Sequence, residues 1–191
     1  APGNGRDMSH RNRHIALLAL AVCLLAPPSA SCREALTDSD KKEIVYRMYA
    51  GYKKNFPAVS DISPREAMAL QRDGKVLFVD TRKPEEIAVS RLPGAVSADD
   101  FQNAPEKYRD RVIVAYCTIS YRSGLFAEKM KNQAITVLNL EGGILAWVLE
   151  GGTVYDDNGP TRRIHVYGPK WNYPASGYEA VIFGLWHRLL P

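Results

Sequence analysis

Two short apolar segments constrain the fold of this chain more than any other feature, namely residues 76–79 and residues 112–116. Continuous apolar runs of this length are typical of strands that are buried on both faces of a parallel sheet. Each run is followed by a segment with helical spacing, so that strands and helices alternate from residue 59 onward. This alternation predicts an α/β protein built on a parallel sheet.

The expected elements follow from caps, turns and periodicity. Asp38 or Ser39 is expected to cap a first amphipathic helix, and Ser63 followed by Pro64 is a helix start. The expected helices cover residues 37–52, 63–71, 84–90, 123–131 and 144–149, and the expected strands cover residues 76–79, 95–96, 112–116 and 135–140. Asp80 and Cys117 end two of these strands, where parallel sheets bind their ligands.

The N-terminal segment has the pattern of a secretory signal peptide. Arg11 and Arg13 precede an apolar run over residues 15–26, and small residues follow at 29–31. We therefore expect residues 1–31 to be a signal peptide, with residues 1–7 an upstream remnant before Met8. The net charge of +4 is mild, and nothing in its distribution argues for nucleic-acid binding.

Cys32 follows the small residues directly, as in the lipidation motif of bacterial lipoproteins, although Ser29 stands where that motif usually has Leu. Two alternatives are open. Either Cys32 is lipidated and anchors an exported protein to a membrane, or the signal is a plain one and the product is soluble in the periplasm. An incidental thiol at Cys32 is the simplest reading of that residue.

Cys117 is the candidate nucleophile. Of the three cysteines, Cys23 lies within the expected signal peptide and Cys32 at its end, which leaves Cys117 alone in the body of the chain. Loop amides and a helix N-terminus after Cys117 would stabilise a thiolate, and Arg122 adds a cation. A buried structural cysteine and a disulfide between Cys32 and Cys117 are the alternatives.

Four motifs occur in order, and together they resemble the rhodanese family of sulfurtransferases. The strand-ending Asp-x-Arg corresponds to residues 79–82 (VDTR), and the turn of residues 91–95 (RLPGA) has Arg91 in place of the usual His. Residues 117–123 (CTISYRS) are similar to the active loop, with Ser120 where Gly is frequent. Residues 140–147 (LEGGILAW) are similar to the Gly-Gly-x-x-Ala-Trp signature.

The resemblance covers residues 59–152 and implies a single rhodanese-like domain. Its fold would be an α/β parallel five-stranded sheet with helices on both faces. Residues 32–58 then form an N-terminal helical extension, and residues 153–191 form an aromatic-rich C-terminal extension. For this last segment two roles are open: packing back on the domain, or acting as a lid or docking surface near the active loop.

The resemblance also implies a chemistry, in which Cys117 takes sulfur from a donor such as thiosulfate and passes the persulfide sulfur to a thiol or to cyanide. An exported redox protein is a candidate thiol partner. Asp80 is expected to support the loop by bonding its amides, and Arg82 to pair with Glu85 or Glu86 or to orient the loop. The residues expected to bind substrate or stabilise anions are Arg122, Thr118, Ile119, Ser120, Tyr121, Ser123 and Arg82.

Other function classes fit the sequence less well. Four residues separate Cys117 from Arg122, whereas the related dual-specificity phosphatases carry one more, so sulfur transfer is favoured over phosphatase or arsenate chemistry. A non-catalytic rhodanese-like binding module is the main alternative. His165 and His187 lack metal-ligand spacing and carboxylate neighbours in the sequence, so we expect no metal and no cofactor.

Overall fold

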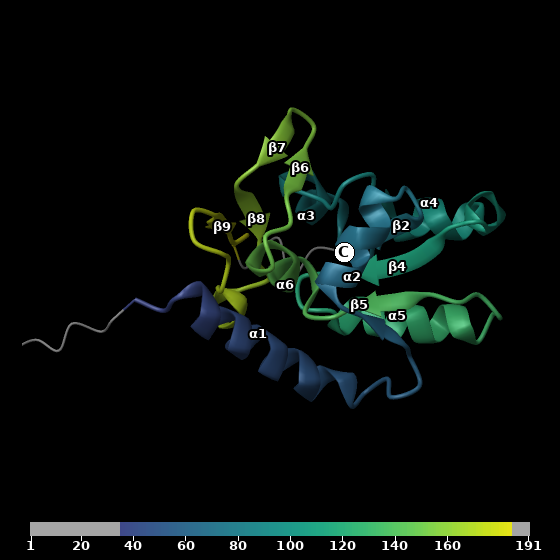
Figure 1. Cartoon of the computed structure of the whole chain (residues 1–191), viewed down its shortest axis with the longest axis horizontal. Helices are drawn as coiled ribbons and strands as arrows, with labels where there is room; N and C mark the ends of the chain where they lie inside the picture. The colour runs from purple at the N-terminus through teal and green to yellow at the C-terminus, as the bar shows by residue number, and fades with distance from the viewer. Residues whose placement is uncertain (1–34, 185–191) are drawn as a thin grey trace, which may run out of the picture. The chain divides into compact units, whose positions relative to one another are not determined.

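The computed structural model of the protein describes residues 35–184, and from residue 36 onward these belong to one compact unit (Figure 1). The expected signal peptide, the expected lipidation site at Cys32 and residues 185–191, including His187, lie outside the described residues. No helix among residues 35–184 is long and apolar enough to cross a membrane.

A parallel five-stranded sheet forms the centre of this unit, with the strand order β1-β5-β4-β2-β3. The two apolar runs become the central pair, in which Phe78 faces Val114 and Val79 faces Ala115. The strands are β1 (Asp61–Ile62), β2 (Val76–Asp80), β3 (Val96–Ser97), β4 (Val112–Tyr116) and β5 (Leu138–Leu140). The expected fold class is therefore confirmed, although β5 is shorter than residues 135–140 and the pattern of residues did not indicate β1.

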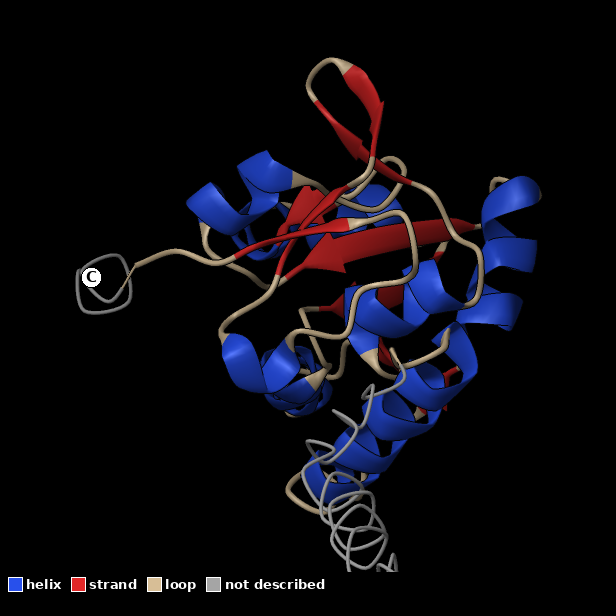
Figure 2. Cartoon of the chain, turned by 90° about the vertical axis from the view of Figure 1, so that its left-hand side faces the viewer, coloured by secondary structure: helices blue, strands red, loops and turns tan. Residues whose placement is uncertain are grey.

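Successive side chains of the central strands point to opposite faces of the sheet, and this divides the core into two layers. Val76 and Phe78 of β2 pack on one face of the sheet, and Leu77 and Val79 pack on the other. Helices cover both faces, as Figure 2 shows, because each face of a buried parallel strand needs an apolar cover. They are α1 (Asp38–Lys53), α2 (Pro64–Arg72), α3 (Pro84–Val89), α4 (Ala98–Asn103), α5 (Tyr121–Lys131) and α6 (Gly143–Leu149).

The N-cap residue of the first helix lies earlier in the chain than expected. Thr37 caps α1, and not Asp38 or Ser39: its hydroxyl accepts a hydrogen bond from the Asp40 amide, while the Asp40 carboxylate accepts one from the Thr37 amide. This reciprocal capping satisfies two amides that the helix leaves open. Helix α1 packs against α5 and α6, so it is part of the same unit as the sheet.

The C-terminal extension packs back on the domain. It contains an antiparallel hairpin, β6 (Val154–Asp156) with β7 (Gly159–Thr161), which projects from the unit in Figures 1 and 2. A parallel pair follows, β8 (Arg163–His165) with β9 (Glu179–Val181). The Ile164 and Val166 side chains are fully buried in the core, which explains why this segment is ordered against the sheet.

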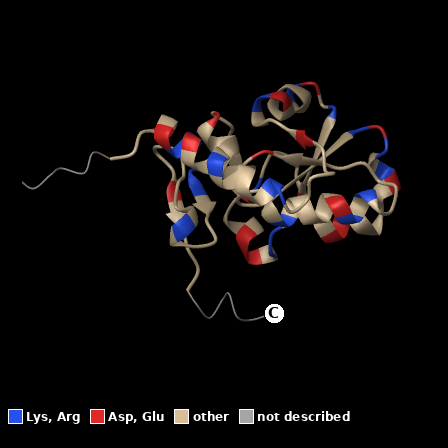
Figure 3. Cartoon of the chain, turned by 90° about the horizontal axis from the view of Figure 1, so that it is seen from below, with Lys and Arg blue, Asp and Glu red and all other residues tan. Residues whose placement is uncertain are grey.

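Two short 3-10 helices, η1 (Pro105–Tyr108) and η2 (Pro169–Trp171), complete the described elements. Basic and acidic residues are interspersed along the helices in Figure 3, and neither sign gathers on one face in that view.

Candidate active site

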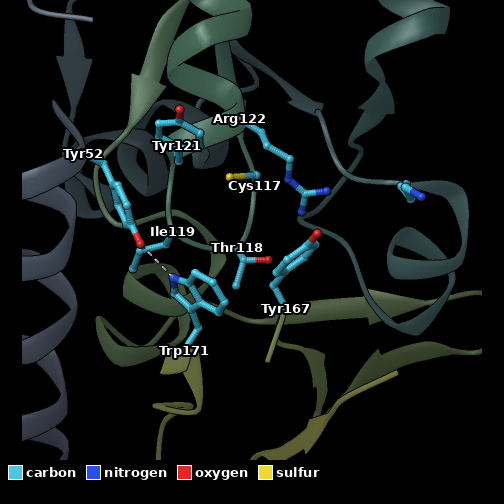
Figure 4. A pocket seen from close by; sticks show the side chains of 9 residues that line it. Tyr52, Cys117, Thr118, Ile119, Tyr121, Arg122, Tyr167 and Trp171 are labelled. Atoms are coloured by element: carbon cyan, nitrogen blue, oxygen red, sulfur yellow. Dashed lines mark hydrogen bonds between the residues drawn. The ribbon is translucent and has the colours of Figure 1, made fainter. Parts of the chain in front are cut away.

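Cys117 lies directly after β4, in the loop that leads into α5. Its thiol is free, and only 2% of the residue is exposed. Figure 4 shows the Cys117 side chain among the residues that line a cavity of about 460 Å³. The strand places the thiol at the carboxyl edge of the sheet, and the helix after it directs its first-turn N–H groups, which have no acceptor in the helix, toward the loop.

Ser120, which stands where the family often has Gly, has a left-handed backbone conformation with φ 68° and ψ 21°. Its hydroxyl donates a hydrogen bond to the carbonyl oxygen of Leu140. The bond to Leu140 compensates for a conformation that favours glycine, and it fixes the loop to the end of β5.

Asn139 supports the same loop from beneath the sheet edge. Its amide nitrogen donates to the Ser120 carbonyl at 3.3 Å and to the Tyr49 hydroxyl at 3.1 Å, and its oxygen accepts from the Ser123 hydroxyl at 2.7 Å. Ser120 and Ser123 were among the residues expected to bind substrate or stabilise anions. The structure instead bonds both to the protein scaffold, where they hold the loop.

Two glycines at the start of α6, the N-cap Gly142 and the first helical residue Gly143, allow this helix to approach the Cys117 loop. The Ile144 amide donates to the Cys117 carbonyl at 2.9 Å, and the Leu145 amide donates to the Thr118 carbonyl at 3.3 Å. A Cβ on Gly143, whose φ is +60°, would lie 2.3 Å from the Cys117 carbonyl oxygen. Position 143 therefore requires glycine for two reasons: its backbone conformation is left-handed, and the loop lies too close for a side chain.

Replacing Gly143 by Ala is expected to destabilise the fold by about 2–4 kcal/mol, from left-handed strain plus a backbone clash. Gly74 is the matched control, because it has φ +67° and nothing within 4 Å of a built Cβ. Gly74→Ala should cost only the strain, about 1 kcal/mol. Urea unfolding of both variants measures the difference, and equal losses would show that the approach of the loop does not require Gly143.

Arg122 forms the cationic wall of the site. Its two terminal nitrogens donate to the two Glu86 oxygens at 2.6 and 2.9 Å, and its guanidinium lies 5.5 Å from the Tyr167 ring centroid. Burial opposes the charge on Arg122, but the Glu86 bonds and the nearby Cys117 sulfur outweigh it and raise the pKa of Arg122 above its ordinary value. Arg122 is therefore a fixed cation beside Cys117.

Glu86 is the residue that fixes Arg122, and the sequence did not indicate this. Its carboxylate also accepts from the Lys83 amide at 3.0 Å and lies 2.9 Å from Nδ1 of His165. Burial opposes the charged form of Glu86, yet the nearby His165 and the bonds from Arg122 outweigh it and hold the pKa of Glu86 well below its ordinary value. His165, which has no carboxylate neighbour in the sequence, thus gains one through the fold.

The structure gives Arg82 other partners than expected, whereas Asp80 has a structural role and accepts a hydrogen bond from the Arg82 amide at 3.1 Å. Arg82 is buried away from the cavity, where its Nε and Nη2 donate to the Asp80 carboxylate at 2.8 and 2.6 Å and its Nη2 donates to the Ser90 carbonyl at 2.6 Å. Glu85 and Glu86 are not its ion-pair partners, and it does not line the substrate cavity. Asp80 binds Arg82 and the Tyr116 hydroxyl, so this pair braces β2 against β4 and the α3–β3 connection.

The cavity brings together the predicted loop and residues that sequence reasoning missed. Five predicted residues line it, and four others join them: Tyr52 from α1, Lys83 before α3, and Tyr167 and Trp171 from the C-terminal extension. The predicted residues that line it are Cys117, Thr118, Ile119, Tyr121 and Arg122. The density of aromatic residues in the extension was the only sequence signal for this contribution. Among the described residues there is no group of three His, Cys, Asp or Glu side chains that could hold a metal ion.

Comparison with known proteins assigns the domain. Residues 63–150 match the sequence model of the Rhodanese-like domain. A protein of Allochromatium vinosum named sulfurtransferase is 38% identical over 80 residues, which cover 40% of this chain and 75% of that protein.

Two further relatives match this chain over a smaller share of their own length. An uncharacterized Synechocystis protein is 30% identical over 104 residues, or 52% of this chain and 58% of that protein. A tRNA sulfurtransferase of Desulfurococcus amylolyticus is 29% identical over 137 residues, or 64% of this chain and 27% of that protein. The chain thus spans less than two thirds of the length of each of these two relatives. The family match, the Allochromatium relative and the parallel sheet with its strand-end cysteine agree, and the chain belongs to the rhodanese-like domain family.

Proposed function

We propose that this protein is a sulfurtransferase that carries sulfane sulfur as a persulfide on Cys117. The observation that supports this most directly is the position of Cys117, which lies on a cavity beside the fixed cation Arg122 and before the first turn of α5. This surrounding stabilises an anionic sulfur and its anionic donor, as charge-stabilising sites do.

In the donor half-reaction, the Cys117 thiolate attacks the outer sulfur of a donor such as thiosulfate. A bond forms between Sγ and this sulfur, and the sulfur–sulfur bond of thiosulfate breaks. The bonding electron pair leaves with sulfite, and Cys117 is left as a persulfide anion. Arg122 and the first-turn amides of α5 lie where negative charge gathers during this step.

In the acceptor half-reaction, the persulfide sulfur leaves Cys117. Cyanide attacks it to give thiocyanate, or a thiolate attacks the protonated persulfide to give an acceptor persulfide. In both cases the bond to Sγ breaks, and Sγ keeps the electron pair as the thiolate that begins the next cycle. The acceptor thiol releases its proton to solvent before it attacks.

We also propose that the protein works outside the cytoplasm, where the thiol of an exported redox protein or of a small molecule takes the sulfur. The basic start, the apolar run and the small residues before Cys32 support this proposal. Mass spectrometry of the mature protein from bacterial cells tests it. A chain that starts at Cys32 or close to it supports export, a lipid mass on Cys32 supports anchoring, and an unprocessed N-terminus contradicts both.

Mass spectrometry after thiosulfate treatment tests the sulfur-transfer proposal. We expect the mass of one added sulfur on the peptide that contains Cys117, and we expect cyanide to remove it with formation of thiocyanate. An unmodified Cys117 at saturating thiosulfate would contradict the proposal and favour a non-catalytic binding module. Release of phosphate from an aryl phosphate, with no added sulfur, would favour the phosphatase alternative.

A further inference from the structure

Four aromatic rings follow one another around the opening beside Cys117, and we call the set of Tyr121, Tyr52, Trp171 and Tyr167 the aromatic arc. Successive rings of the arc are in contact. The Tyr121 and Tyr52 ring centroids are 5.3 Å apart, and the Tyr167 and Trp171 ring centroids are 5.5 Å apart. Between them, Nε1 of Trp171 donates to the Tyr52 hydroxyl at 3.3 Å. Arg122 closes the arc through its contact with Tyr167, and Figure 4 shows these side chains around Cys117.

The arc is built largely by the two extensions and not by the rhodanese-like domain alone. Tyr52 lies on α1, and Tyr167 and Trp171 lie in the C-terminal extension, whereas the family match covers residues 63–150. The extensions therefore add a wall to the active loop. Packing alone does not account for it, because 39% of Tyr121 and 42% of Tyr167 remain exposed. Large aromatic side chains left exposed around a cavity are typical of binding sites.

The size of the cavity also favours an organic ligand over a small anion. Its volume of about 460 Å³ lies within the range of roughly 300–1,000 Å³ that pockets for organic ligands have, and an ion such as thiosulfate or cyanide fills only a small part of such a space. Aromatic walls contribute little to binding a small hydrated anion. They contribute much to an apolar or aromatic group, which they remove from water.

We propose that the aromatic arc is the binding site for the acceptor, and that this acceptor is an organic thiol with an aromatic or apolar body next to its sulfur. The inference rests on the proposed sulfur transfer through Cys117. The body of the acceptor lies against the arc, and its thiolate points to the persulfide on Cys117. It attacks the outer sulfur, the bond between that sulfur and Sγ breaks, and Sγ keeps the electron pair.

Acceptor competition on the full chain tests this inference. With thiosulfate as donor, sulfite release reports every acceptor in the same way, so kcat/KM can be compared for cyanide, 2-mercaptoethanol and benzyl mercaptan. We expect benzyl mercaptan to exceed 2-mercaptoethanol, a thiol of similar acidity, by about tenfold or more, because its ring is buried against the arc. This comparison needs no variant, so it holds even where a substitution disturbs folding.

Trp171→Ala removes the centre of the arc and is expected to reduce the preference for benzyl mercaptan to about twofold or less. Tyr108→Ala is the matched control, because Tyr108 is an aromatic residue that stacks on Phe101 in another part of the fold and does not line the cavity. It should keep the full preference.

The outcomes separate the inference from the function on which it rests. Thiocyanate formation with equal kcat/KM for the two thiols would overturn the arc as an acceptor site and leave the sulfur transfer intact. A folded Trp171→Ala protein that keeps the full preference would overturn it as well. If neither sulfite nor thiocyanate forms with any acceptor, the proposed function itself fails, and the inference fails with it.

Discussion

Replacing Cys117 by Ser is expected to lower thiosulfate-to-cyanide sulfur transfer by about 10³-fold or more, because the reaction has no other nucleophile of its kind at the cavity. Serine keeps nearly the same shape, but its hydroxyl is not ionised near neutral pH and its oxygen cannot form the persulfide. Since Cys117 is buried and its carbonyl, rather than its sulfur, holds α6, the fold should remain.

Thiocyanate formation and thermal unfolding, measured on the same preparations, check this prediction. Cys32→Ser is the matched control within the chain, because it removes a thiol that lies outside the described residues, and it should keep wild-type transfer. A Cys117→Ser protein with transfer within a factor of two of wild type would contradict the role of Cys117. Loss of transfer in both variants would point to a reaction that involves both thiols.

The second large effect is expected at Glu86. Glu86→Gln keeps the size of the side chain but removes the charge that faces Arg122 and His165. Breaking a fully buried ion pair costs roughly 3–5 kcal/mol, and because 31% of the Arg122 side chain is exposed and can be hydrated, we expect about 2–3 kcal/mol here. A loosened Arg122 should also lower kcat/KM for thiosulfate by about 10- to 100-fold.

Glu85→Gln is the matched control for both measurements. Glu85 is the neighbouring residue in the first turn of α3, and its side chain is exposed. Its replacement should change the stability by no more than about 0.5 kcal/mol and leave transfer near wild type. Equal effects of the two replacements would show that the first turn of α3, and not the Glu86 carboxylate, supports Arg122.

The stability difference at Glu86 should also depend on pH in a defined direction. Burial raises the pKa of Glu86, but the nearby His165 and the bonds from Arg122 outweigh it and lower the pKa in the folded protein from its ordinary value of 4.5. The carboxylate then stabilises the fold fully above about pH 4.5, and this contribution is lost as the pH falls below that value. The gap between wild type and Glu86→Gln should be constant from pH 6 to pH 8 and should narrow below about pH 4.5.

The candidate site shows how far local sequence signals reach. Cys117, Arg122 and the loop between them lie on one continuous segment at the end of an apolar strand, so their closeness could be predicted from the chain alone. Glu86 is 36 residues from Arg122, and no spacing rule connects them. Arg82 was misassigned for a different reason. Its carboxylate partner, Asp80, is only two residues away, and the spacing of the residues does not show that the Arg82 side chain folds back onto it.

The sequence by itself determined the sheet, because residues 76–79 and 112–116 have no stable place except between two helical layers, and it determined Cys117 as the strand-end thiol. Tertiary structure alone decided what surrounds that thiol. Tyr52, Tyr167 and Trp171 come from the two extensions and line the cavity, and His165 contacts Glu86. The C-terminal residues are placed there by the burial of apolar side chains such as Ile164 and Val166 in the core. Burial of apolar surface fixes where such segments pack, but it depends on contacts between distant residues, and these are not encoded in any local pattern.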